Sequence, residues 1–425
     1  MSAPHPAPVP APTTSTCDVL VVGAGPAASR QVVGTGTARR ACAHHLAAGG
    51  LTVLLVDQHN FPRDKVCGDG LIPDAHAALR RLGVYDEVAA LATPVPHVRC
   101  VGPRGGLVDV PGTISVLPRK VLDHILVRNA QRAGARLLTP LRFEAPLLDG
   151  EQVVGARFKS TTGPHEIRAR WVVMATGAVP QAISAAGLCD RQTPSSVALR
   201  GYVRHDGLVD QVTQLHMVWH PRLRGGYGWI FPGPGGVFNI GVGLTGSHTV
   251  GRNGKGRMQD VNLRDMFNAF CEVHAVAGEL VRHGQMQGGL KGAPLRCTLG
   301  GARWSRPGML ATGEAIGSTY AFTGEGIGKA LETGLLAAEA LLKSPQAADA
   351  EVRQAYATAL ARLAPRFEMY ETASYVNMHP WIADIVVWRA QRSPRVLDRL
   401  SGLLEETSNP GHLFTWRGLR RLMFE

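Results

Sequence analysis

The sequence lacks the features of several protein classes. No apolar run reaches the ~18 residues that a membrane-spanning helix needs, so we expect any membrane contact to be peripheral. The seven cysteines are widely spaced and include no CxxC pair, which argues against a zinc or iron–sulfur site and against a disulfide framework. No HExxH pattern occurs either, and we expect no metal. A reducing cytoplasm suits this cysteine usage best.

Nucleic-acid-binding motifs are also absent, although the chain is basic. Lys and Arg total 45 against 33 Asp and Glu, a formal net charge of +12. Without a helix-turn-helix, zinc-finger or RNA-binding pattern, we expect no nucleic acid partner. The positive charge then has three remaining explanations: an anionic membrane face, an anionic ligand such as a dinucleotide or diphosphate, or arginines that are simply solvated. Residues 1–16 alternate Pro with small residues and lack the pattern of a signal peptide, which predicts a disordered tail.

A β-α-β unit is present near the start of the chain. Residues 17–22 and 51–56 are short, almost wholly apolar runs of the kind that form buried parallel strands. A helical stretch at 38–48 lies between them and stops at two glycines. The unit predicts a right-handed crossover and a parallel sheet.

A glycine loop follows the first predicted strand. Gly23 and Gly25 allow a tight turn and a close approach of the backbone to a pyrophosphate at a helix N-terminus. The loop departs from GxGxxG, because Ala28 stands at the third position. Asp57, the expected ribose-binding acid, lies 32 residues after Gly25 instead of about 20.

A second near-copy of the loop, at residues 32–36, has the usual distance to Asp57. Two interpretations follow. In the first, Gly23–Ala28 is the phosphate loop and residues 29–39 are an insertion; in the second, the later copy forms the loop. We favour the first because a full strand precedes it. A glycine turn without a ligand is the remaining alternative.

Further motifs follow in a fixed order along the chain. They are Phe61-Pro-Arg-Asp-Lys-Val-Cys-Gly-Asp-Gly70, Pro118-Arg119 with Leu122-Asp123, Ala175-Thr-Gly177, Gly226-Tyr-Gly-Trp-Ile-Phe-Pro232 with Asn239-Ile-Gly-Val-Gly243, and Thr312-Gly-Glu-Ala315 with Ala321-Phe-Thr-Gly-Glu-Gly-Ile-Gly328. Together they resemble the geranylgeranyl reductase family of FAD-dependent oxidoreductases, within the p-hydroxybenzoate-hydroxylase-like flavoprotein superfamily. The resemblance runs from residue 17 to the C-terminus.

The resemblance implies FAD and the residues that contact it. They are Gly23, Gly25, Pro26, Ala27, Asp57, Lys65, Arg119, Gly177, Gly313, Glu314, Gly324, Gly326 and Ile327. A helix beginning near Gly326 would aim N–H groups at the flavin's N1–C2=O edge and favour its reduction. Glu314 departs from the family, which usually has Asp there, so the ribityl contact would be one methylene longer.

The expected fold is α/β: a Rossmann-like FAD-binding domain of the GR2 type, an interleaved antiparallel substrate sheet and a helical C-terminal region. The expected parts are a tail at 1–16, the FAD-binding domain at 17–100, 101–192 and 301–345, the substrate sheet at 193–300 and the C-terminal region at 346–425.

Three side chains are candidates for the chemistry. Reduction of an isolated C=C bond needs a hydride from the flavin and a proton on the other carbon. The resemblance places Cys67 near the pocket, although a free Cys is ordinarily a small buried hydrophobe. Tyr227 and Trp229 are expected to shape an apolar slot, the alternative being core packing. Lys65 and Arg63 are candidates to meet FAD phosphates or a diphosphate head group, or else lie in a solvated loop.

The C-terminal region mixes aromatic residues with arginines, as a membrane-surface face does, the alternative being a helical cap. These residues are Trp381, Trp388, Phe414, Trp416, Phe424, Arg389, Arg392, Arg395, Arg399, Arg417, Arg420 and Arg421. Peripheral contact at the inner membrane face agrees with an apolar substrate.

The leading hypothesis is an FAD-dependent reductase of C=C bonds in an isoprenoid chain on a lipid, quinone or pigment, with NADPH or a ferredoxin as electron donor. A flavin monooxygenase or halogenase is the first alternative. Tryptophan-type halogenases carry a two-Trp motif where this chain has only Trp229, which argues against that branch. A flavin- or lipid-binding protein without turnover is the second alternative, motivated by the irregular glycine loop.

Overall fold

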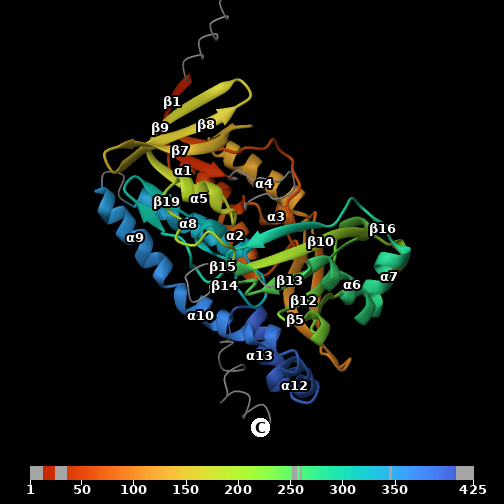
Figure 1. Cartoon of the computed structure of the whole chain (residues 1–425). Helices are drawn as coiled ribbons and strands as arrows, with labels where there is room; N and C mark the ends of the chain where they lie inside the picture. The colour runs from red at the N-terminus through yellow and green to blue at the C-terminus, as the bar shows by residue number, and fades with distance from the viewer. Residues whose placement is uncertain (1–12, 24–35, 251–255, 259–260, 344–346, 408–425) are drawn as a thin grey trace, which may run out of the picture.

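The structure is a computed structural model that describes residues 13–23, 36–250, 256–258, 261–343 and 347–407. Two large sheets organise these residues, one of eight strands and one of nine, with a small two-stranded sheet beside them (Figure 1). The small sheet pairs β14 (His248–Val250) with β15 (Gly256–Met258). The two large sheets correspond to the expected α/β and antiparallel parts.

The first sheet is built around parallel strands in the order β19-β9-β1-β2-β6. Their bounds are β19 Met309–Ala311, β9 Gly163–Ala175, β1 Thr13–Gly23, β2 Val53–Val56 and β6 Arg136–Leu138. The strands β7 (Arg142–Asp149), β8 (Gln152–Ser160) and β18 (Ser305–Arg306) pair antiparallel at its margins. The chain order reverses between β1 and β9, the place where open α/β sheets bind ligands at the carboxyl ends of their strands.

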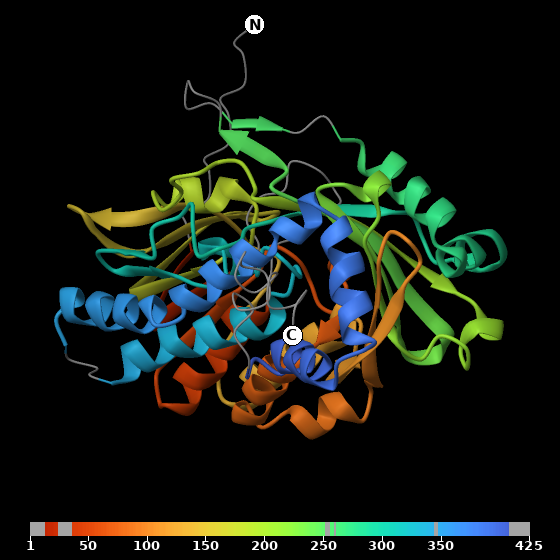
Figure 2. The same cartoon turned by 90° about the horizontal axis from the view of Figure 1, so that it is seen from below.

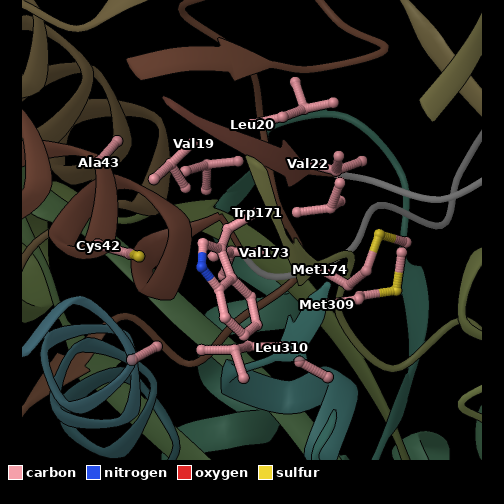
Figure 3. Packing of buried hydrophobic residues seen from close by; sticks show 14 of the residues in the cluster. Val19, Leu20, Val22, Cys42, Ala43, Trp171, Val173, Met174, Met309 and Leu310 are labelled. Carbon is pink, nitrogen blue, oxygen red and sulfur yellow. The ribbon is translucent and has the colours of Figure 1, made fainter. Parts of the chain in front are cut away.

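The apolar runs read from the sequence form the centre of this sheet. Figure 3 shows Val19, Leu20 and Val22 of β1 packed with Trp171 and Met174 of β9. All of them are buried. Strands that are covered on both faces carry such continuous apolar runs.

Helices cover the first sheet. They are α1 (Thr37–Ala48), α4 (Arg119–Arg132), α5 (Pro180–Ala185), α8 (Ile327–Leu342) and α9 (Asp349–Ala361), with α2 (Pro73–Arg81) and α3 (Tyr85–Ala89) against α8 and α4. The helices α1 and α8 lie directly against each other, although they are almost 300 residues apart in the chain. A Cβ added to Gly334 of α8 would stand 2.2 Å from the carbonyl oxygen of Ala38, so this approach requires a glycine.

The second sheet follows the order β16-β10-β13-β12-β11-β4-β5-β3, with β17 also on β10. Its strands are β3 Gly70–Leu71, β4 Thr93–Val101, β5 Leu107–Val116, β10 Ser196–Arg204, β11 Leu215–Val218, β12 Gly226–Pro232, β13 Val237–Thr245, β16 Gln285–Met286 and β17 Lys291–Leu295. The sheet therefore takes β3, β4 and β5 from segments that the sequence interpretation placed in the FAD-binding domain at 17–100 and 101–192. These strands join because β4 pairs in parallel with β11, more than 100 residues later.

Helices lie on both faces of the second sheet (Figure 2). The pair α6 (Leu263–Val273) and α7 (Ala275–His283) covers one face, where Ile230 and Phe270 are buried. The C-terminal helices α12 (Trp381–Ala390) and α13 (Pro394–Leu404) cover the face that carries Trp229. The helices α10 (Ala364–Ala373) and α11 (Tyr375–Met378) lead to them. No described helix is long and apolar enough to cross a bilayer.

Candidate active site

A cavity lies where the two sheets and the C-terminal helices meet. It has a volume of about 230 Å³. One group of lining residues comes from the first sheet and its helices, among them Thr37, Lys65, Arg119 and Glu314. The other group is apolar and comes from the second sheet and from α12 and α13. The cavity thus joins a charged wall to an apolar chamber.

Nine of the predicted site residues line this one cavity. They are Lys65, Cys67, Arg119, Tyr227, Trp229, Glu314, Gly324, Gly326 and Ile327. Thr37, the first residue of α1, lines it as well, so the N-terminal crossover and the segment 323–328 meet at the same space. Gly177 (φ 79°) follows the end of β9, and Gly313 (φ 67°) directly precedes Glu314.

The predicted phosphate loop lies largely outside the described residues. Gly25, Pro26, Ala27 and the glycine at 34 belong to residues 24–35, which the structure does not describe. The strand β1 ends in the first glycine copy at Gly23, and α1 begins directly after the second copy at Gly36. Residues 37–39, the end of the stretch interpreted as an insertion, form the first turn of α1.

Asp57, at the end of β2, is fully buried and ion-paired. Arg39 contacts one of its carboxylate oxygens, and the Arg63 guanidinium lies 3.7 Å from the same oxygen. The other oxygen accepts a hydrogen bond from the His59 backbone N–H at 2.8 Å. Burial by itself would raise the pKa of the Asp57 carboxyl, but the guanidinium groups of Arg39 and Arg63 outweigh it and lower the pKa.

A second buried carboxylate, Asp123 on α4, organises the other arginines. It accepts hydrogen bonds from Arg119 at 2.7 and 3.0 Å and pairs with Arg40 at 2.9 Å. Burial would raise its pKa, and the surrounding guanidinium groups lower it well below its usual range. Sequence reasoning quoted Asp123 in a motif but assigned it no role, and it missed Arg39 and Arg40. The available signal was two arginines on the helix turn directly after the second glycine copy.

The Lys65–Glu314 pair stands beside this cluster. The Lys65 ammonium lies 3.9 Å from the Glu314 carboxylate, and both side chains are buried. Burial lowers the pKa of Lys65 to about 8 and raises the pKa of Glu314. Glu314 also accepts a hydrogen bond from the Thr319 hydroxyl at 3.4 Å. The carboxylate that replaces the family's Asp therefore still faces the cavity.

The loop that carries Cys67 is fixed by Asp69. Asp69 has φ 69°, which is unusual for a residue other than glycine. Its carboxylate accepts hydrogen bonds from the Tyr202 hydroxyl at 2.5 Å, the Asn239 amide at 2.8 Å and the Arg119 backbone N–H at 3.1 Å. Asn239 also donates to the Cys67 carbonyl at 2.6 Å. This set of bonds positions Cys67 beside the start of α4.

Aromatic rings line the chamber. Neighbouring centroids of Trp219, Tyr227, Trp229 and Phe231 lie 6.1–6.3 Å apart along the sheet. The polar atoms of these rings are satisfied: Trp229 donates to Asn239 at 3.0 Å, and Tyr227 donates to the Thr323 carbonyl. Burial raises the pKa of the Tyr227 hydroxyl. Tyr227 and Trp229 therefore line the cavity and also belong to the hydrophobic core of the second sheet. Trp219, which lines the same cavity, was missed from the sequence.

The segment before α8 carries a neutral acid. Gly324 adopts φ 71°, and the N-cap of α8, Gly326, has no side chain to cap the first turn. Glu325 between them lines the cavity, and burial raises the pKa of its carboxyl to about 8, with the nearby Asp74 and Glu406 adding to the effect. Sequence reasoning read this segment for its glycines and missed Glu325.

The residues present suit the cofactor that the resemblance implies. The hydroxyls of Thr37, Thr176 and Ser318 are buried without a hydrogen-bond partner among the described residues. They stand at the start of α1, after β9 and after β19. Buried polar atoms of this kind call for a polar ligand. The N-cap of α8, Gly326, has no side-chain cap, and buried arginines stand at the start of α1. No cluster of three metal-ligating side chains occurs in the part of the chain described.

Known proteins resemble this chain in its first half and over most of its length. Residues 16–213 match the model of an FAD binding domain. A menaquinone reductase of Mycobacterium tuberculosis is 32% identical over 353 residues, covering 77% of this chain and 76% of that protein. A digeranylgeranylglycerophospholipid reductase of Methanopyrus kandleri is 29% identical and covers 76% of each chain.

Solved structures share the fold. A geranylgeranyl bacteriochlorophyll reductase-like protein from Thermoplasma acidophilum superposes with a TM-score of 0.69 at 21% identity, over 97% of each chain. A flavin-dependent brominase gives a TM-score of 0.71 at 18% identity, over 96% of this chain and 98% of that one. The expected fold class is confirmed, and FAD is the cofactor.

Proposed function

The chain belongs to the geranylgeranyl reductase family of FAD-dependent oxidoreductases, and from this premise we propose that it reduces carbon–carbon double bonds in an isoprenoid chain carried by a quinone, lipid or pigment. The observation that carries the proposal is the cavity, whose charged wall leads directly into an aromatic, apolar chamber. A polyprenyl chain offers no hydrogen-bonding groups. A chamber whose own polar atoms are already satisfied suits it.

The relatives favour reduction over oxygenation or halogenation. The fold itself does not separate these reactions, because the brominase superposes as well as the reductase-like protein does. The sequence relatives at 32% and 29% identity are named as reductases of a prenylated quinone and a prenylated lipid. A polyprenyl menaquinone is therefore the first substrate to test.

The chain's residues would divide the work as follows. FAD supplies the hydride when reduced, and the Thr37, Arg119, Glu314 and Gly326–Ile327 side of the cavity would hold it. Tyr227 and Trp229 orient the alkene and exclude water. The proton for the second carbon comes from a neutral acid on the wall.

Two side chains are proposed as that acid. Glu325 is supported by its position on the cavity and by a pKa of about 8, which keeps it protonated at neutral pH. Cys67 is supported by its motif and by its half-buried place on the same wall. Glu325→Gln and Cys67→Ser separate them: the variant without the proton donor loses turnover but still accepts electrons into its flavin.

The electron donor and the membrane contact remain proposals. NADPH or a ferredoxin is proposed to reduce the flavin. Exposed Trp381 and Trp388 on α12, with exposed Arg392, Arg395 and Arg399, support a peripheral contact with anionic lipid. Phe414, Trp416, Phe424, Arg417, Arg420 and Arg421 lie outside the described residues.

One experiment tests the function. The purified protein is reduced anaerobically, incubated with a polyprenyl menaquinone, and the product is weighed by mass spectrometry. Addition of two hydrogens per double bond supports the proposal. A product that gains oxygen or halogen in air, with no hydrogen added anaerobically, would establish the monooxygenase or halogenase alternative instead. A yellow protein without any product would support binding without turnover.

A further inference from the structure

Buried charges gather between the start of α1 and the carboxyl ends of β2 and β19. The described residues contribute five cations and three carboxylates, each at most 8% exposed. The cations are Arg39, Arg40, Arg63, Lys65 and Arg119; the carboxylates are Asp57, Asp123 and Glu314. All eight take part in ion pairs of the cluster, which is left with two more positive charges than negative ones.

Such an excess is costly in a protein interior. A buried charge is tolerated when it is paired and hydrogen-bonded, and otherwise carries a penalty of several kcal/mol. Arg40 shows the effect, since burial lowers the pKa of its guanidinium well below the ordinary value even though Asp123 lies 2.9 Å away. None of its three nitrogens has a hydrogen bond of good geometry among the described residues. The cluster calls for a dianion.

The start of α1 shows where that dianion would sit. Gly36 is the N-cap and offers no capping side chain, and the first turn has no acidic residue. The adjacent Thr37 hydroxyl is buried, has no hydrogen-bond partner among the described residues and belongs to a cavity-lining residue. The free N–H groups and partial positive charge of a helix start attract anions.

Arg40 folds back over this helix start. A Cβ added to Gly36 would stand 2.6 Å from the Arg40 guanidinium nitrogens, so the guanidinium lies over the N-cap of its own helix. Arg39 lies in the same way over Gly23 at the end of β1. Both guanidinium groups also lie over the ring of Phe61, whose centroid is 4.8 Å from the Arg40 guanidinium carbon and 5.4 Å from that of Arg39. The Arg40 guanidinium therefore lies over the N-cap residue of α1, and the Arg39 guanidinium lies over the end of β1.

We infer that Arg40, assisted by Arg39, binds the diphosphate of FAD at the N-terminus of α1. The two negative charges of that group match the two uncompensated positive charges of the cluster. A guanidinium can bind phosphate oxygens through two parallel hydrogen bonds, which the nitrogens of Arg40 have available. This deepens the FAD binding on which the proposed function rests. It also assigns the anion to side chains of α1 in addition to a glycine loop.

A substrate diphosphate is the other source of the same chemistry, so the test uses ligands that separate the two. Full-length protein is stripped of flavin and titrated by flavin fluorescence with FAD and with riboflavin, which has no phosphate. Geranylgeranyl diphosphate is titrated separately by calorimetry. The variants are Arg40→Gln and the conservative Arg40→Lys, and the matched control is Arg104→Gln, which removes one charge from a side chain that is 91% exposed.

The expected result is selective for the diphosphate. Arg40→Gln should weaken FAD about 10- to 100-fold, the size of a lost charge-assisted pair, and leave riboflavin within about twofold. The FAD affinity of Arg40→Lys should lie between those of Arg40→Gln and the wild type, and the FAD affinity of Arg104→Gln should equal that of the wild type. The melting temperature of the flavin-free Arg40→Gln protein should equal or exceed that of the wild type, because one buried charge is gone while Asp123 keeps Arg119.

Three results would overturn the inference: FAD affinity unchanged in Arg40→Gln, FAD and riboflavin weakened equally, or weakening confined to geranylgeranyl diphosphate. The inference and the function fail separately. A wild type that binds FAD but reduces no polyprenyl chain refutes only the function. A wild type that reduces a polyprenyl chain, together with an Arg40→Gln variant of unchanged FAD affinity, refutes only the inference.

Discussion

Replacing Glu325 with glutamine removes an acid that the fold keeps protonated. The side chain is half-buried on the cavity wall, and desolvation, with the nearby charges of Asp74 and Glu406, raises the pKa of its carboxyl to about 8 from an ordinary value of 4.5. Glutamine has nearly the same shape and stays neutral at every pH. The substitution therefore isolates the electrostatic cost of ionising this position from any change in packing.

The sign of the pH dependence follows from the raised pKa. Below pH 4.5 the carboxyl is neutral in the folded and unfolded states alike, and the full stability is present. Between pH 4.5 and 8 the unfolded chain ionises while the fold holds its proton, so the free energy of unfolding falls. At 1.36 kcal/mol per pH unit, the loss reaches about 3 kcal/mol at pH 7 and about 5 kcal/mol above pH 8.

Glu325→Gln should escape this loss. The melting temperature of the FAD-saturated variant should exceed that of the wild type by about 3–5 °C at pH 8 and by about 1 °C at pH 5, given the unfolding entropy of a chain of this size. Turnover is measured on the same samples, and the wild-type rate should decline as pH rises through 8. A thermal advantage that stays the same from pH 5 to pH 9 would show that Glu325 is not held neutral, and the argument for its role as acid would fail with it.

Other substitutions test the remaining parts of the site. Trp229→Ala should cost about 3–5 kcal/mol of stability by urea denaturation and raise KM for a polyprenyl substrate, whereas Trp229→Phe, which keeps a ring, should cost much less; equal losses would contradict the slot. Lys329→Met leaves Asp74 and Glu406 without their shared buried cation, whose Nζ lies 3.0 Å from Glu406. The substitution should cost about 3–5 kcal/mol in the same assay, and no loss would show that these ion pairs do not stabilise the fold. Asp69→Asn keeps a residue that tolerates positive φ but replaces the carboxylate that accepts the Tyr202 hydrogen bond with an amide. The substitution should lower the free energy of unfolding by about 1–3 kcal/mol, and an equal loss in Tyr202→Phe would confirm the contribution of that hydrogen bond.

The sequence predicted those elements of the fold that short stretches of residues determine. The runs at 17–22 and 51–56 and the helix at 38–48 correspond to β1, β2 and α1, because continuous apolar strands and glycine stops are read within a few residues. The predicted disordered tail at 1–16 was wrong for its last residues, because β1 begins at Thr13 and residues 13–16 pair with β9. The membership of β4 in the second sheet was missed, because its pairing with β11 joins segments that nothing in either local pattern connects. Register across such a distance is decided by packing of the whole sheet.

The site divides in the same way. Glycines and the Lys65, Arg119 and Glu314 positions were predicted from motifs, and all three side chains line the cavity. Arg39 and Arg40 were missed because an arginine in a helix ordinarily faces solvent, and only the folded chain shows that these two are fully buried. Glu325 was missed because its raised pKa depends first on desolvation in the folded chain and then on Asp74 and Glu406, which are far from it in the sequence.

The placement of α12 and α13 has a consequence for how the protein is made. These helices supply one wall of the chamber, and they are synthesised after the strands whose face they cover. Until residues 381–404 dock, the aromatic face around Trp229 is exposed to water. Such an exposed hydrophobic surface promotes aggregation or binding by a chaperone. Truncation of the chain near residue 380 should therefore yield a protein that still binds flavin through the first sheet. Its substrate chamber would lack one wall, and the protein should aggregate.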